Sequence, residues 1–394
     1  MRKLFIGALT TLAVLATACG GNDQEPSESS VDLAALDVGS YPTVPIDVET
    51  VRTPASGAAR EAIRIGSATP LPLEYDSRFT YFPQQVHGSR VTTAEPPYFR
   101  GTGIEAKAFT TEVPGLVAGW RMAATRRPLE NAGRGVETFT LRFETADLAK
   151  RAAQTLMERA PGDIFPLGDF PESYTKVTTP DTNGGYLRTW MTQGDILLHI
   201  AIRDPVSRPY SPADDKEIAK RFLAKQLEKL RSYSPTPLGE IAQLPMDIDG
   251  LLSKTVPWTT PLGGGAAVYP VHVATSMMSP HDTMSAALVD AGVDYVALNA
   301  AIVARSRDDA SAARLFAAYQ REIDERPGRV AVEPPPHLPG ARCYSPDADP
   351  DNQTSSQSVC RVQVGRYVAS VTGLEVRDLR QRISAQYKLL ATAG

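Results

Sequence analysis

The apolar and polar positions in the first half of the chain predict two groups, each containing strands and a helix. Apolar residues that nearly alternate with polar ones are typical of a strand, and an apolar residue at every third or fourth position is typical of a helix. Glycine between two apolar runs indicates a hairpin turn, here at Gly194. In chain order, the predicted elements are a strand at 136–143, a helix with Thr145 as N-cap and the stripe Leu148, Ala152 and Leu156, hairpin strands at 186–192 and 195–202, and a long helix beginning at Ser211 and Pro212 with the buried face Ile218, Phe222, Leu223, Leu227 and Leu230.

The second half repeats this order with low residue identity, so the pattern predicts a structural repeat. The predicted elements are a strand at 295–305, a helix beginning at Asp308 and Asp309 with the stripe Ala312, Leu315, Phe316, Tyr319 and Ile323, hairpin strands at 360–364 and 367–372 around Gly365, and a last helix with the stripe Val376, Leu379, Ile383, Tyr387 and Leu390. We therefore predict an α+β protein of two tandem domains. Each domain is expected to be an antiparallel sheet with helices packed on one face.

Proline and serine residues mark the predicted boundaries. The segment 232–237 interrupts the helical pattern, which places an N-terminal α+β domain at 41–236 and a C-terminal one at 240–394. Five prolines in 81–134 predict loops with short strands, and a weak helical stretch covers 58–65. A strand is predicted at 267–273 after a flexible glycine turn.

The beginning of the sequence predicts export and acylation. Arg2 and Lys3 precede an uncharged apolar run at 4–16, and small residues then lead to Cys19. This arrangement resembles a bacterial lipobox, which implies a signal peptide at 1–18 and a lipid on Cys19 as the first mature residue. The alternative is an ordinary cleaved signal with a chance cysteine. The polar residues that follow predict a flexible tether over 19–40.

The other two cysteines, Cys343 and Cys360, form an even pair in a chain predicted to be exported. We predict a disulfide between them, which stabilises the fold by about 3 kcal/mol in the loop-entropy account. The alternative is two reduced, buried thiols.

Charge and composition narrow the classes of partner. The chain has 394 residues, with 41 Lys and Arg against 45 Asp and Glu and a net charge of −4. Removing Arg2 and Lys3 leaves 39 basic residues against 45 acidic ones, a net charge of −6. The net negative charge excludes a dedicated nucleic-acid binder. It also gives no attraction to anionic headgroups, so the lipid is the only predicted membrane attachment. With 42% hydrophobic and 22% charged residues, the composition excludes collagen, a disordered chain and a multi-span membrane protein.

The segment after the tether resembles a known family. The run from Asp32 to Asp37, followed by Gly39, Ser40, Tyr41 and Pro42, is similar to the opening of actinobacterial lipoproteins of unknown function. That resemblance implies a large N-terminal and a smaller C-terminal domain, and it implies no activity. By topology and cysteine placement, the C-terminal half also resembles the extracellular sensor domains of mycobacterial serine/threonine kinases.

The sequence predicts no catalytic residues and no cofactor. The Gly-x-Ser-x-Gly motif of α/β-hydrolases is absent, and Ser173 with Lys176 matches Ser-x-x-Lys without the partner motifs of penicillin-binding proteins. The three glycines at 263–265 lack the lysine and hydroxyl of a phosphate loop, so we interpret them as a turn.

No metal site is predicted either. The five histidines do not occur at His-x-x-x-His spacing; they are His87, His199, His272, His281 and His337. Asp347, Asp349 and Asp351 resemble the first half of a calcium loop, but Asn352 and Ser358 stand where glycine and glutamate are needed. An acidic, solvated loop is therefore favoured over a calcium site. Asp282, after His281, is expected to favour the dipole at a helix start.

Two kinds of side chain remain as candidates for a binding site. Alternation places His199 on the face opposite Ile196, Leu198 and Ile200, toward solvent or a shallow pocket. Trp120, Trp190 and Trp258 are predicted to pack in the core or between domains, with the alternative that one lines an apolar ligand site.

These observations favour a membrane-anchored extracytoplasmic lipoprotein that binds or senses a ligand without catalysis. The expected partner is an envelope lipid, a small molecule or an envelope protein, and the binding residues are not identified. One alternative is a component of a larger envelope assembly, and another is an envelope hydrolase with an unrecognised site.

Overall fold

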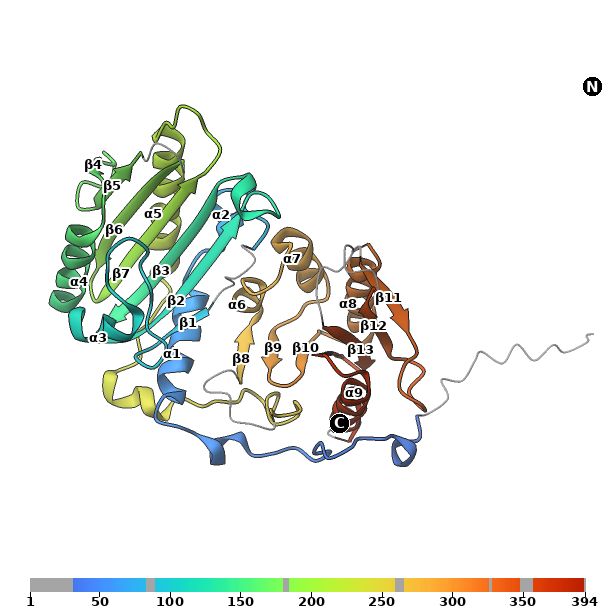
Figure 1. Cartoon of the computed structure of the whole chain (residues 1–394). Helices are drawn as coiled ribbons and strands as arrows, with labels where there is room; N and C mark the ends of the chain where they lie inside the picture. Colours follow the sequence, from blue (N-terminus) through green and yellow to red (C-terminus); the bar gives the residue numbers. More distant parts are fainter. Residues whose placement is uncertain are drawn as a thin grey trace, which may run out of the picture.

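The computed structural model describes residues 31–82, 89–179, 184–258, 266–325, 328–347 and 357–392. They form two seven-stranded antiparallel sheets, sheet A from the first half and sheet B from the second, with helices around both (Figure 1). The predicted α+β class and the two antiparallel sheets are confirmed.

The first half contains sheet A and most of the longer strands. Its elements are α1 (Ser56–Ser67), α2 (Pro72–Tyr75), β1 (Ser89–Val91), α3 (Phe109–Glu112), β2 (Leu116–Thr125), β3 (Gly135–Phe143), α4 (Ala146–Arg159), β4 (Asp163–Ile164), β5 (Tyr174–Thr178), β6 (Gly185–Gln193), β7 (Ile196–Asp204) and α5 (Ala213–Leu230). Short 3₁₀ turns lie at Leu33–Ala35, Val48–Val51, Ala106–Ala108, Glu130–Ala132 and Leu238–Gln243.

The second half contains sheet B and has the same succession of strands. Its elements are β8 (Ala267–Pro270), α6 (Val271–Thr275), α7 (His281–Asp290), β9 (Tyr295–Leu298), β10 (Ile302–Arg305), α8 (Asp309–Asp324), β11 (Arg329–Val332), β12 (Arg342–Pro346), β13 (Ser358–Val364), β14 (Tyr367–Gly373) and α9 (Val376–Ala391). No helix among the described residues combines the length and the apolar character that crossing a bilayer requires.

The two sheets have one topology, which confirms the predicted repeat. Sheet A has the order β1-β2-β3-β7-β6-β5-β4, and sheet B has the order β8-β9-β10-β14-β13-β12-β11. Each strand of sheet A therefore has a counterpart seven strands later in the chain. The hairpin turns carry glycine with positive φ in both halves, +58° at Gly194 and +52° at Gly365, where a residue without Cβ avoids strain.

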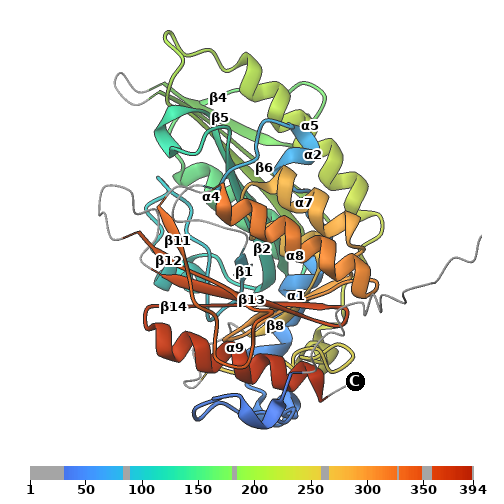
Figure 2. The same cartoon turned by 90° about the vertical axis from the view of Figure 1, so that its right-hand side faces the viewer.

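Helices cover both faces of each sheet, whereas the sequence predicted helices on one face only. In sheet A, α4 packs with Leu141 and Leu197 on one face, while α5 packs with Leu198 and Ile200 on the other. In sheet B, α8 and α9 lie on opposite sides of β13 and β14 (Figure 2). The prediction failed because amphipathic stripes show that a helix is buried without showing which face of the sheet it covers.

Three predicted segments differ in detail. The run 295–305 forms two strands, β9 and β10, because Asn299 turns the chain between them and accepts hydrogen bonds from the Ala300 and Trp258 backbone amides. Only the first four residues of the predicted strand 267–273 are extended, and α6 follows. The loop-rich stretch 81–134 contains the ten-residue strand β2, the second strand from one edge of sheet A.

Residues 31–40, predicted as part of a flexible tether, are folded against the second half. Leu36 is buried in a cluster with Leu379 and Ile383 of α9, and the Gln381 amide donates to the Asp37 carboxylate at 3.0 Å. Tyr41, the first residue of the predicted N-terminal domain, donates its hydroxyl to Asp378 at 2.5 Å. The blue segment in Figure 1 accordingly runs beneath α9 rather than beside sheet A.

A continuous core joins the two halves. Trp120 of β2 and Ile63 of α1 are buried together with Tyr269, Leu288 and Leu315 of the second half. The Trp120 and Tyr269 rings meet edge to face with centroids 6.3 Å apart. The halves therefore share apolar surface that neither half covers alone.

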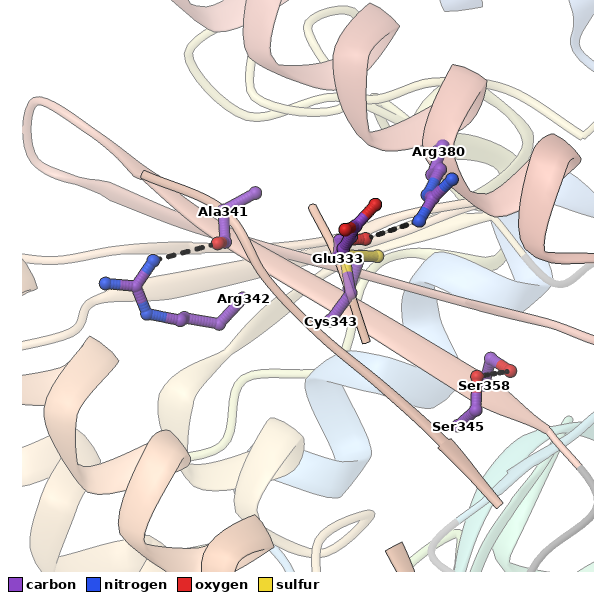
Figure 3. Close-up of a disulfide and its surroundings, with 8 residues drawn as sticks. Glu333, Ala341, Arg342, Cys343, Ser345, Ser358 and Arg380 are labelled. Carbon is purple, nitrogen blue, oxygen red and sulfur yellow. Dashed lines mark hydrogen bonds between the residues drawn. A yellow bond between two sulfur atoms is a disulfide. The ribbon is translucent and has the colours of Figure 1, made fainter. Parts of the chain in front are cut away.

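The predicted disulfide between Cys343 and Cys360 is present. The two residues are direct partners in the β12–β13 register, with Cα atoms 4.1 Å apart, and both are buried beneath α9. Beside the bridge, Arg380 of α9 donates to the Glu333 carbonyl at 2.8 Å, which ties the helix to the chain after β11 (Figure 3).

Candidate functional site

One face of sheet A carries an open pocket of about 120 Å³. Its floor comes from alternate residues of the four central strands, because successive side chains on a strand point to opposite faces. The floor residues are Arg121, Ala123 and Thr125 of β2, Gly135 and Glu137 of β3, Tyr186, Arg188 and Trp190 of β6, and His199, Ala201 and Arg203 of β7.

The pocket occupies the part of this face that α4 leaves uncovered. The helix packs over the lower rows, where Phe143, Leu141 and Leu197 are buried with Leu156. The chain before α3 supplies the remaining wall through Phe99, Arg100 and Thr102. The site therefore has a rigid floor of paired strands and one wall from a loop, a common setting for ligand binding.

His199 and Trp190 are paired neighbours at the base of the pocket. Their ring centroids are 4.9 Å apart, and the Phe99 ring meets the imidazole edge-on at 5.0 Å. His199 Nδ1 lies 3.0 Å from the Thr189 carbonyl oxygen, so Nδ1 carries the proton and donates it. Burial, assisted by the nearby Arg188 charge, lowers the pKa of His199 to about 3. The imidazole is therefore neutral at physiological pH.

Positive charge dominates the lining. Among the described residues, four arginines reach the pocket and Glu137 is the one acidic residue of its lining. Arg121 holds that carboxylate, with Nε 2.6 Å from Oε1, and Arg203 donates to Asn131 at 2.6 Å. Arginine side chains therefore outnumber carboxylates in the described lining. Such a site favours an anionic ligand.

Arg188 is the most buried of the pocket cations, with 6% of the side chain exposed. Its guanidinium lies 4.8 Å from the centre of the Tyr186 ring and donates to Thr178 Oγ1 at 3.3 Å. Desolvation lowers the pKa of Arg188, and the neighbouring Arg100 charge adds to that effect.

The other candidate residues do not assemble into a site. Ser173 Oγ donates to the Phe170 carbonyl at 2.7 Å and Lys176 Nζ to the Ala160 carbonyl at 2.8 Å, so the two are held apart by different backbone groups. Within the described residues, no three His, Cys, Asp or Glu side chains are grouped as metal ligands. His87, the glycines 263–265 and the loop 348–356 lie outside the described residues.

The remaining histidines and tryptophans have separate surroundings. His272 Nε2 contacts the Thr69 carbonyl at 2.7 Å, His281 begins α7 as predicted and is fully buried, and His337 is exposed. Trp120 packs between the halves, as predicted. Trp258 is 41% exposed, whereas the sequence predicted that it packs in the core or between domains.

The sequence analysis missed the arginines of the pocket. A signal for them exists in the β6–β7 hairpin, where one face reads Tyr186, Arg188, Trp190 and His199, Ala201, Arg203, while the other face of β7 is aliphatic from Ile196 to Ile202. A helix-covered face of a sheet is expected to be apolar, so polar and aromatic residues on both hairpin strands indicate an opening in the cover.

Comparisons with known proteins match this chain to one family, whose function is unknown. Residues 48–246 match a family described as "Domain of unknown function (DUF7373) N-terminal", and residues 251–393 match "Domain of unknown function (DUF7373) C-terminal". No curated protein matches. Among solved structures, the extracellular domain of PknH from Mycobacterium tuberculosis is similar at 11% identity, over 49% of this chain and 100% of that domain. Its TM-score of 0.29 is too low to support an inference about this chain.

Proposed function

The chain belongs to the DUF7373 family, and from that premise we propose that it is a binding protein that holds a small ligand in the pocket of sheet A without chemically changing it. The observation that carries the proposal is the uncovered part of the sheet face, where a neutral histidine and a tryptophan form the base and cations outnumber carboxylates. A recess of this kind, with an apolar floor and a few convergent polar groups, is a common setting for a small ligand.

The chemistry of the pocket favours binding over hydrolysis. A general base works best with a pKa near the operating pH, whereas burial lowers the pKa of His199 to about 3. His199 Nδ1 is bonded to a backbone carbonyl rather than to a carboxylate that would orient it for proton transfer. Glu137, the one carboxylate that the described part of the chain contributes to the lining, is already paired with Arg121.

We further propose that the protein is exported and anchored through a lipid on Cys19. The sequence before Cys19 supports this placement, and the Cys343–Cys360 disulfide is consistent with an oxidising compartment. Replacing Cys19 with alanine is then expected to move the protein from the membrane fraction to the soluble fraction. Retention of the variant in the membrane fraction would contradict the lipid anchor.

Ligand binding is tested by native mass spectrometry of residues 19–394 carrying Cys19→Ala, followed by denaturation and a search for released small molecules. The expected result is one small molecule per chain. The Ala201→Phe variant, which fills the pocket, is expected to lose it, whereas Ala331→Phe on the exposed edge strand β11 is expected to retain it. A molecule that survives in Ala201→Phe lies elsewhere, and its retention would refute the assignment of the pocket.

A further inference from the structure

Two arginine side chains of the described chain are almost fully buried, and their surroundings differ. Arg142, 5% exposed, has Nη1 at 2.9 Å from Glu61 and Nε at 3.1 Å from Asp195. Arg188, 6% exposed, has no carboxylate within ion-pair distance among the described residues. Its contacts are Thr178 and the Tyr186 ring. One buried cation is therefore neutralised by the protein and the other is not.

A buried charge without a counter-ion is costly, because water no longer solvates it and no opposite charge replaces the water. Glu137 attracts Arg188 from a distance, but its carboxylate is held by Arg121. Arg188 faces the pocket from β6, opposite Ala201. The counter-ion that this arrangement lacks is therefore one that enters the pocket.

The guanidinium and the surfaces beside it define the chemistry of that counter-ion. A planar guanidinium fork matches the two oxygens of a carboxylate. Among the apolar lining residues, Ala201 and the Tyr186 ring are half-buried and accessible from the pocket, whereas Trp190 and Phe99 are almost fully buried.

We propose that the ligand is a small amphipathic carboxylate, whose acid group pairs with Arg188 and whose apolar body lies against Ala201 and the Tyr186 ring. This inference rests on the proposed function, since it assigns a chemical class to the ligand of the same pocket. It predicts that affinity depends on the negative charge of the ligand and on the guanidinium together.

The test is calorimetric titration of residues 19–394 carrying Cys19→Ala with two acids, 3-phenylpropionate and octanoate, and with their uncharged amides. At least one acid is expected to bind about 10- to 100-fold more tightly than its amide, as loss of a charge-assisted hydrogen bond predicts. Equal affinity of acid and amide would overturn the carboxylate assignment while leaving the pocket as a binding site. Tighter binding of inorganic phosphate than of either acid would also overturn it.

Arg188→Gln and Arg142→Gln form a matched pair of variants, because both remove a buried guanidinium. Arg188→Gln is expected to weaken acid binding about 10- to 100-fold while the melting temperature of the ligand-free protein stays the same or rises. Arg142→Gln is expected to lower the melting temperature, because it leaves Glu61 buried and unpaired. A structural role for Arg188 would instead lower the melting temperature in both variants and leave acid binding unchanged.

The failure of the proposed function is distinguishable from the failure of this inference. If neither acids nor amides bind and the purified protein releases no small molecule, both the proposed function and the carboxylate assignment are wrong. If the released molecule is uncharged, the proposed function stands and the carboxylate assignment is wrong.

Discussion

The two halves of the molecule share a topology but differ in the length of their central strands. β2 and β3 span ten and nine residues, whereas their counterparts β9 and β10 span four each. Counted from the hairpin glycines, Ser370 corresponds to His199, and its partner Ile302 is the first residue of β10. The rows that bear Glu137 and Arg203 therefore lie beyond the level at which β9 turns into β10.

This difference shows how one fold supports a site in one copy and a different role in the other. The extra rows of sheet A extend past the covering helix and provide the floor of the pocket. In sheet B the strand pair ends sooner, and the second half instead has the disulfide and the packed N-terminal segment. Function here follows from strand length and side-chain choice on a shared topology, as is usual for widely used folds.

The largest expected effect comes from breaking the core between the halves. Trp120→Ala is expected to lower the free energy of unfolding by about 3–5 kcal/mol, because it leaves a cavity where Trp120 meets Tyr269. Chemical denaturation followed by near- and far-ultraviolet circular dichroism measures this. The half-exposed Trp258→Ala serves as the control, with an expected loss below about 1 kcal/mol. Two separate transitions in the wild-type protein would show that the halves unfold independently.

The next largest expected effect on stability comes from removing the disulfide, and it is confined to the second half. Replacing both Cys343 and Cys360 with serine is expected to lower the free energy of unfolding by about 3 kcal/mol. The reason is that the unfolded chain regains the conformational entropy that the bridge removes by joining residues 17 positions apart. Hydrogen exchange is expected to accelerate mainly in β11–β13, and the wild-type protein in reductant provides the control. Uniform acceleration in sheet A as well would contradict a local role for the bridge.

Acid is expected to destabilise both halves through one buried histidine in each. Burial lowers the pKa of His199 to about 3 and that of His281 to about 4. Below an ordinary pKa of about 6.5 the unfolded chain binds protons that the folded chain does not, so stability falls as the pH falls. Each histidine contributes a slope of up to about 1.4 kcal/mol per pH unit between pH 6.5 and its folded pKa.

Denaturation at several pH values checks this with His199→Gln and His281→Gln. Each variant is expected to bind about one proton fewer on unfolding in acid. The decrease of the free energy of unfolding with falling pH is therefore expected to be less steep. Asp215, whose pKa burial raises to about 6, titrates in the same interval with the opposite sign, and its contribution cancels between variant and wild type. An unchanged slope in both variants would assign the acid sensitivity to other groups.

The smallest effect tests the equivalence of the two hairpin turns. Gly194→Ala and Gly365→Ala are each expected to lower the free energy of unfolding by about 1 kcal/mol, because both glycines have positive φ. No steric clash adds to this loss, since no heavy atom lies closer than 3.7 Å to an added Cβ. Equal losses in denaturation experiments support the structural repeat. A loss at only one site would show that the turns are not equivalent.

Local patterns predicted much of this architecture. The helix stripes, the glycine hairpins and the even cysteine pair depend on residues close in sequence or on simple counting, and the structure contains all three. The prediction of a single strand at 295–305 was wrong, because the unbroken apolar stretch gives no indication of the turn at Asn299. Strand β2 was missed because its surroundings are rich in proline and glycine.

The pocket was beyond sequence reasoning because it depends on register between distant strands. Alternation correctly placed His199 away from Leu198 and Ile200, but nothing local places Arg121 of β2 on the same face as Arg188 of β6. Likewise, a stripe on α4 shows that the helix is buried and does not show where its cover of the sheet stops.

Under the proposed anchor, the N-terminal segment folded against α9 limits the distance between the second half and the bilayer. Eleven residues, 20–30, separate Cys19 from the first described residue, and even a fully extended chain of that length spans at most about 40 Å. The second half is therefore tethered close to the lipid headgroups, and sheet A lies on the far side of the shared core (Figure 1). Under the proposed anchor, the second half would therefore lie between the bilayer and the pocket of sheet A.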